Sequence, residues 1–111
     1  MAIDIKKYLF DILLSIETIE SHLINTNTYE KFEGNLLLID AVERRLAIIG
    51  EALNKAVKIQ HDIAISNKTE IIKLRHLLIH HYDETDEAII WNIIQTDLPV
   101  LKKEIELLLK D

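Results

Sequence analysis

The side chains best suited to proton transfer and anion binding are concentrated in one stretch, residues 73–82, near the end of the third predicted helix. Its sequence is Lys-Leu-Arg-His-Leu-Leu-Ile-His-His-Tyr, so one arginine, three histidines and one tyrosine fall within eight residues. Histidine can act as a general acid or base near neutral pH, and arginine carries a permanent charge that binds anions. This stretch is therefore the first candidate for a functional site.

The helical period separates these side chains into two groups. On a helical wheel with Arg75 at 0°, the apolar residues fill an arc from about 200° round to about 60°, and Arg75 and Tyr82 lie within it. His76 and His80 lie at about 100° and 140°, on the polar side. If Arg75 and His80 act together, either the helix ends or bends near His80, or the two side chains come from two different chains.

A guanidinium in an apolar arc needs an anionic partner, because it keeps its charge when it is buried. Two interpretations remain open for Arg75: a structural ion pair with a carboxylate such as Glu51 or Glu43, and a site for a phosphate group. His76 and His80 have a spacing that also permits two metal ligands on one helix face. No motif indicates a third ligand, so no metal site is predicted.

Composition limits the fold and the class of protein. The chain has 111 residues, of which 49% are apolar, with two glycines, one proline and no cysteine, which predicts one helical domain over residues 1–111. The absence of cysteine excludes disulfides, thiolate metal sites and a cysteine nucleophile. No apolar run approaches the ~20 residues that span a bilayer, and the N-terminus is unlike a signal peptide. We therefore expect a soluble, cytoplasmic protein without membrane contact.

The net charge of −6 limits how the chain could bind RNA. Broad electrostatic binding of nucleic acid requires a basic face, and neither half of the chain carries a basic excess. Any RNA site must therefore be local or assembled from two chains.

Apolar periodicity and capping residues define five predicted helices. Gly50 lies inside the second of them, where glycine costs about 1 kcal/mol relative to alanine, so a packing reason for it is expected. The segment 59–66 is predicted to be a connection, and Asn67 with Glu70 resembles a helix start. The fold class is an all-α, antiparallel four-helix up-and-down bundle with an additional short helix. The predicted ranges are 4–23, 29 or 35 to 58, 67–82, a short helix at about 86–94, and a fifth that starts at 97–99.

Little else in the sequence indicates a known catalytic chemistry. There is no glycine-rich phosphate loop and no serine in a sharp-turn motif. Arginine and histidine remain, and they are the minimum set for metal-free cleavage of RNA. One imidazole can take the ribose 2′-OH proton, another can protonate the leaving oxygen, and a guanidinium can stabilise the charge that develops at phosphorus.

Three segments resemble the HepT-like branch of the HEPN-domain ribonucleases. Residues 75–82 resemble its Arg-x4-His-x-Tyr motif, and residues 40–52, Asp-Ala-Val-Glu-Arg-Arg-Leu-Ala-Ile-Ile-Gly-Glu-Ala, resemble its second-helix signature. Asp86, Trp91 and the run 97–101 are similar to the end of that family's domain. The three segments occur in the family's order and together span nearly the whole chain.

The resemblance implies a function and partners. The family forms helical dimers in which the motifs of both chains face a shared cleft, and it supplies toxins that cleave RNA, including tRNA, without a metal or other cofactor. The antitoxin is a minimal nucleotidyltransferase. By this resemblance Arg75 and His80 are catalytic, and Tyr82 is the residue to which the antitoxin adds AMP.

Two further residues are candidates for supporting roles, Glu51 and His76. The family commonly has a polar amide where this chain has His76. The alternative to a ribonuclease is a non-catalytic helical module that binds a nucleotide or a protein and partners a nucleotidyltransferase.

Overall fold

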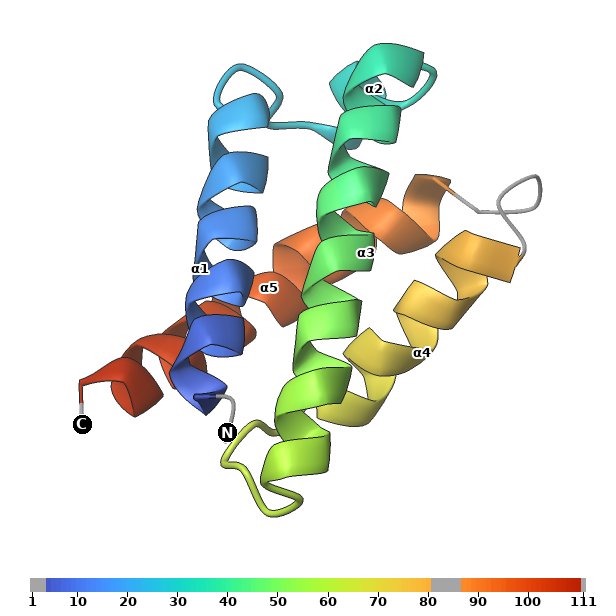
Figure 1. Ribbon diagram of the computed structural model, residues 1–111. Helices are drawn as coiled ribbons and strands as arrows, with labels where there is room; N and C mark the ends of the chain where they lie inside the picture. The colour runs from blue at the N-terminus through green and yellow to red at the C-terminus, as the bar shows by residue number, and fades with distance from the viewer. Residues whose placement is uncertain (1–3, 81–86, 111) are drawn as a thin grey trace.

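Helices form all the regular secondary structure of the residues that the structure describes, 4–80 and 87–110 (Figure 1). In α4 the side chains of residues 76, 77, 79 and 80 also lie outside this description. The computed structural model confirms the predicted all-α fold class. The helices are α1 (Ile5–His22), α2 (Tyr29–Phe32), α3 (Leu36–Ile59), α4 (Lys68–His80) and α5 (Glu87–Leu109).

Helices α1 and α3 are antiparallel neighbours, and so are α3 and α4 (Figure 1). Figure 1 shows α1, α3 and α4 side by side with alternating direction, while α5 crosses obliquely behind α1 and α3. The most extensive contacts are those of α3 with α1 and with α4. Helix α3 is therefore the central element, and α4, which carries most of the candidate site, packs on one side of it.

The second predicted helix has two possible starts, at residue 29 or 35, because two separate helices begin there. Thr28 caps α2 by accepting a hydrogen bond from the Lys31 amide at 3.3 Å, and Asn35 caps α3 by accepting one from the Leu38 amide at 3.2 Å. Between them Gly34 has a φ of 74°, a conformation that glycine adopts at little cost. The additional short helix of the fold is thus α2, whereas the prediction placed it after residue 86.

The prediction of two helices after residue 86 is wrong, because α5 is continuous from Glu87 to Leu109 with Pro99 inside it. Asp-Leu-Pro resembles a helix start, since proline is tolerated in a first turn. Within a helix, proline removes one hydrogen bond and its ring crowds the carbonyl four residues earlier, which here belongs to Gln95. Both Pro99 and Gln95 are exposed, so the carbonyl that loses its partner lies on the solvent side, where water can bind it.

Helix α4 begins where predicted, but its first turn is fixed mainly by α5. The Asn67 side-chain amide donates to the Asp97 carbonyl at 3.1 Å, and its Oδ1 is buried without a hydrogen-bond partner, so the expected side-chain cap is not formed. The Glu104 carboxylate accepts hydrogen bonds from the backbone amide and the hydroxyl of Ser66, each at 3.1 Å. These contacts hold the start of α4 against α5.

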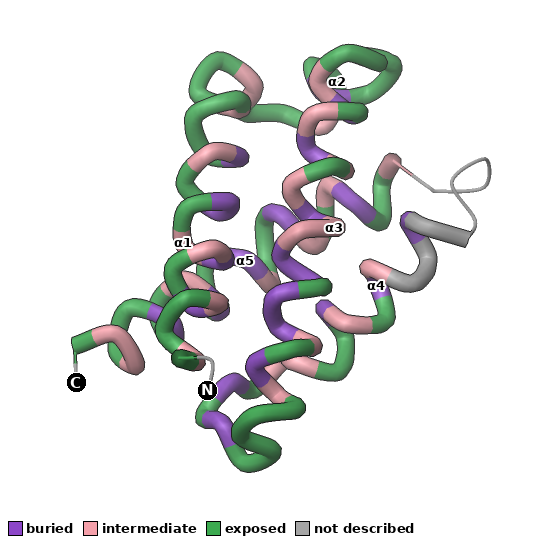
Figure 2. Tube along the Cα trace, viewed as in Figure 1, coloured by how far each residue is buried: buried purple, intermediate pink, exposed green. Residues whose placement is uncertain are grey.

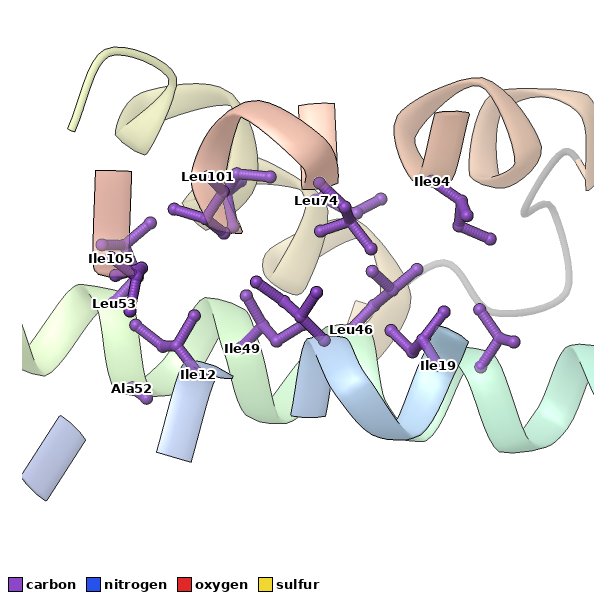
Figure 3. Packing of buried hydrophobic residues seen from close by; sticks show 14 of the residues in the cluster. Ile12, Ile19, Leu46, Ile49, Ala52, Leu53, Leu74, Ile94, Leu101 and Ile105 are labelled. Carbon is purple, nitrogen blue, oxygen red and sulfur yellow. The ribbon is translucent and has the colours of Figure 1, made fainter. Parts of the chain in front are cut away.

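One hydrophobic cluster draws on all five helices and on the connection between α3 and α4. The buried residues line the inward faces of the helices (Figure 2). In Figure 3, Leu101 and Ile105 of α5 lie over the α1–α3 pair, to which Ile12 and Leu53 belong. Phe32 of α2 is fully buried, and its ring centroid lies 5.2 Å from that of Trp91. None of the described helices is both long enough and apolar enough to cross a membrane.

Candidate active site on helix α4

Arg75 lies at the point where α4 packs most closely on α3. Its Cβ faces Gly50 so closely that a methyl group on Gly50 would overlap it. The same methyl group would also lie 3.2 Å from the Arg75 Cγ and 3.3 Å from the Ile71 carbonyl oxygen. The expectation of a packing reason for Gly50 is confirmed, and its contact is with the main candidate residue of the site.

Arg75 is half-buried, and the Nε of its guanidinium is fully enclosed without a hydrogen-bond partner. Neither Glu43 nor Glu51, both in the described part of the chain, forms an ion pair with it. The interpretation of Arg75 as half of a structural ion pair with one of these carboxylates therefore finds no support. A charge in this setting favours binding of an external anion.

Glu51 lies on the other side of α3, in a shallow cleft against α1. Its carboxylate is 3.7 Å from the Lys55 Nζ, and the same cleft of about 150 Å³ is lined by Tyr8 and Asp11. The Lys55 Nζ also lies 5.8 Å from the centroid of the Tyr8 ring. Within one chain Glu51 therefore belongs to the α1–α3 surface, and its supporting role stays a prediction.

Three carboxylates gather where α3 meets the start of α5. Burial raises the pKa of Glu43 above its ordinary value of 4.5, and the negative charges of Asp40 and Glu87 raise it further. Glu87 also accepts a hydrogen bond from the Gly34 amide at 2.9 Å, which holds its carboxylate in place. Helical periodicity does not predict this group, because Glu87 is distant in the sequence from Asp40 and Glu43.

The raised pKa of Glu43 predicts a pH-dependent penalty on stability. Since the folded pKa exceeds the unfolded one, the folded state binds more protons, and the contribution of Glu43 to stability falls as pH rises through 4.5 and the folded pKa. Glu43→Gln should therefore raise the free energy of unfolding at pH 7 by up to about 0.5 kcal/mol, a small value because the group is only partly buried and solvent screens its charge. Urea titrations of both proteins from pH 4 to 8 measure this difference.

Glu51→Gln is the matched control, because its carboxylate is exposed and paired with Lys55. Its substitution should leave stability unchanged or slightly lower at pH 7. Equal effects of the two substitutions would contradict the assignment of the penalty to Glu43.

The backbone of α4 is helical from Lys68 through His80, so the helix does not end before His80. At 100° per residue, positions 75 and 80 therefore lie about 140° apart around the helix axis. The side chains of His76 and His80 are outside the description, as are His81 and Tyr82 entirely. The predicted roles of His76, His80 and Tyr82 stay predictions.

The described part of the chain contains no group of three or more histidine, aspartate or glutamate side chains arranged to hold a metal ion. The pairing of His76 with His80 as metal ligands lies outside the described part of the chain, because neither side chain is described.

Comparison with known families shows which family this helical chain resembles. A family model described as "Ribonuclease HepT-like" matches residues 12–108. The chain belongs to the HepT-like ribonuclease family. The match includes α3, α4 and α5, and with them Gly50, Arg75 and His80.

Relatives within the family are similar over nearly their whole length. "Putative RNase MJ1216" of Methanocaldococcus jannaschii is 36% identical over 109 residues, which cover 97% of this chain and 89% of that protein. "Putative RNase MJ1380" of the same organism is 34% identical over 94% of this chain and 95% of its own. "Probable ribonuclease HepT" of Thermococcus cleftensis is 34% identical over 95% of this chain and 96% of its own. No solved structure matches the chain.

Proposed function

We propose that the chain is an endoribonuclease that cleaves RNA without a metal ion, and that it is the toxin of a toxin–antitoxin pair. The observation that carries this proposal is the half-buried guanidinium of Arg75, which has no carboxylate partner among the described residues. Membership of a family of ribonucleases supports RNA as the source of the missing anion.

The proposed reaction uses Arg75 and His80 in separate roles. The His80 imidazole takes the proton of a ribose 2′-OH, and the 2′ oxygen attacks the adjacent phosphorus. The bond from phosphorus to the 5′ oxygen breaks, a second imidazole donates a proton to that oxygen, and a 2′,3′-cyclic phosphate remains. Arg75 stabilises the negative charge on the phosphoryl oxygens as it develops. His76 and Glu51 are proposed as supporting residues.

In this proposal, a second copy of the chain brings His80 to the phosphate that Arg75 binds. Positions 75 and 80 lie about 140° apart around the axis of α4, so residues at these two positions of one straight helix do not face the same phosphate. We propose a homodimer in which Arg75 of one chain and His80 of the other share a cleft. Two chains also concentrate basic side chains at one place, which a chain with net charge −6 needs in order to bind RNA.

Cleavage of RNA by the purified chain is the direct test. We expect cleavage to persist in excess chelator and to fall by about 100-fold or more in His80→Ala, because a general base contributes about 10²–10⁴. His22→Ala is the matched control, since His22 is exposed at the end of α1 and should have no effect. Fragment ends that carry cyclic phosphate identify the reaction.

Two outcomes contradict the proposal in different ways. Loss of cleavage in chelator would indicate that a metal ion takes part, which would direct attention to His76 and His80 as ligands. Intact RNA together with tight binding of a nucleotide would favour the non-catalytic binding module instead.

Modification of Tyr82 is a separate prediction about regulation. When the chain is co-expressed with a minimal nucleotidyltransferase encoded beside it, we expect its intact mass to increase by one or more AMP units and cleavage to be lost. Tyr82→Phe should abolish the increase, because it removes the phenolic oxygen that attacks the α-phosphorus of ATP and displaces pyrophosphate, whereas Tyr8→Phe on α1 should not. An unchanged mass with full loss of toxicity would indicate inhibition by binding alone.

A further inference from the structure

We infer that Gly50 is the positioning residue for Arg75, and that the contact between them holds the guanidinium in one place. This inference rests on the proposed role of Arg75 in RNA cleavage. It extends that role to a residue on a different helix that has no side chain of its own.

The first observation is the closeness of the contact. A side chain at position 50 would overlap the Cβ of Arg75, and this atom is fixed to the backbone. A rotamer change moves a distal side-chain atom but not a Cβ, so relief requires movement of α4 itself. The Ile71 carbonyl oxygen, at 3.3 Å from the added atom, limits movement along the helix. Glycine is therefore the residue that allows the two backbones to approach this closely.

The second observation is the environment of the guanidinium. The Nε of Arg75 is buried without a hydrogen-bond partner, although arginine side chains usually extend their charged end into water. The close approach at Gly50 keeps the first part of the Arg75 side chain against α3. With Nε enclosed, the terminal Nη1 and Nη2 are the nitrogens left to donate to a phosphate.

The position of the Arg75 guanidinium determines how well it stabilises the charge that develops during cleavage. A displacement of about 1 Å in a catalytic group can reduce the rate by about 100-fold. We therefore expect Gly50→Ala to lower kcat by about 10–100-fold and to change KM for RNA by less than about 3-fold. Alanine favours helix more than glycine does, so a loss of helical propensity is not the cause of this effect.

Ile49→Val is the control for a purely structural effect. Ile49 is the neighbour of Gly50 on α3, is fully buried, and lies on the core side of the helix among Leu46 and Ile12 (Figure 3). Removing its methyl group should lower the denaturation midpoint while leaving kcat unchanged. If kcat falls in proportion to the denaturation midpoint in both Gly50→Ala and Ile49→Val, the inference is overturned.

A direct measurement of the Arg75 side chain does not depend on cleavage. The chain has three arginines, so the Nε–Hε signal of Arg75 can be assigned in a nitrogen–hydrogen NMR spectrum by its loss in Arg75→Lys. In the wild-type chain and in Ile49→Val this signal should exchange with water at least 10-fold more slowly than that of exposed Arg44. In Gly50→Ala the difference should disappear.

The outcomes separate this inference from the proposed function. Fast exchange of the Arg75 Hε in the wild-type chain would overturn the inference, even if Gly50→Ala failed to fold. If the Arg75 Hε still exchanges slowly in Gly50→Ala and this variant cleaves RNA fully, the inference is overturned. The ribonuclease proposal is then unaffected. A wild-type chain that cleaves no RNA would overturn the ribonuclease proposal, and the exchange comparison would still decide whether Gly50 positions Arg75.

Discussion

Replacing Arg75 with methionine is expected to lower RNA cleavage by about 1,000-fold and at the same time to stabilise the fold by about 1 kcal/mol. Methionine keeps an unbranched chain that can pack on Gly50, but it has no Nε–H and no charge. The wild-type chain encloses the Nε without a partner, so the folded state bears a desolvation cost that the variant avoids. Cleavage assays and urea denaturation of the same preparations measure the two effects.

Lys73→Met is the matched control for this prediction. It removes one positive charge from the same helix by the same substitution, but Lys73 is exposed. We expect its cleavage rate to stay within about 3-fold of wild type at physiological salt, because an exposed charge contributes little. A large loss of stability in Arg75→Met would show that the guanidinium has a structural partner, and the case for an external phosphate would then fail.

A substitution that increases stability and lowers activity identifies a residue that is retained for function. Enzymes commonly retain groups at their active sites that cost stability, because the group must be ready for a substrate that is absent from the free protein. Arg75 fits this description, since its Nε is enclosed without a partner and neither Glu43 nor Glu51 of α3 forms an ion pair with it. Glu43 is not a comparable case, because its raised pKa follows from burial and from neighbouring negative charges.

Much of the fold was predictable because apolar periodicity is a local property. On α3, for example, Val42, Leu46 and Leu53 recur at helical spacing in the sequence, and all three are buried. The error at Pro99 arose because Asp-Leu-Pro resembles a helix start, although proline can also lie inside a helix at an exposed position, as Pro99 does. The buried positions Ile90, Ile94, Leu98, Leu101 and Ile105 continue at helical spacing through Pro99. That continuity was the signal for a single helix.

The site was predictable only in part, because its decisive contacts join distant segments. A helical wheel placed Arg75 at the apolar edge of its helix, and the structure finds it half-buried there. The wheel did not identify Gly50 as the residue opposite, since that contact depends on how α3 and α4 cross. The sequence likewise gave no reason to associate Glu43 with Glu87, which the turn at Gly34 and the start of α5 bring together.

A heterodimer of two inactive chains is expected to regain about half of the wild-type activity, because a two-fold dimer has two clefts and one of them would be intact. One chain carries Arg75→Met and the other carries His80→Ala, and the pair is purified by two different tags. If each cleft takes Arg75 from one chain and His80 from the other, one cleft receives both native residues. Each variant homodimer should remain lower in activity by about 100-fold or more.

The reciprocal heterodimer makes this test decisive. It pairs a wild-type chain with a chain that carries both Arg75→Met and His80→Ala. Clefts shared between chains would then each lack one residue, so cleavage should be lost, whereas a site within one chain would leave about half of the activity. Because α4 is helical from Arg75 to His80 and separates the two residues by about 140°, we expect the first heterodimer to be active and the second to be inactive. The opposite result would place both residues in one chain and would require the His80 side chain to turn back across the face of α4.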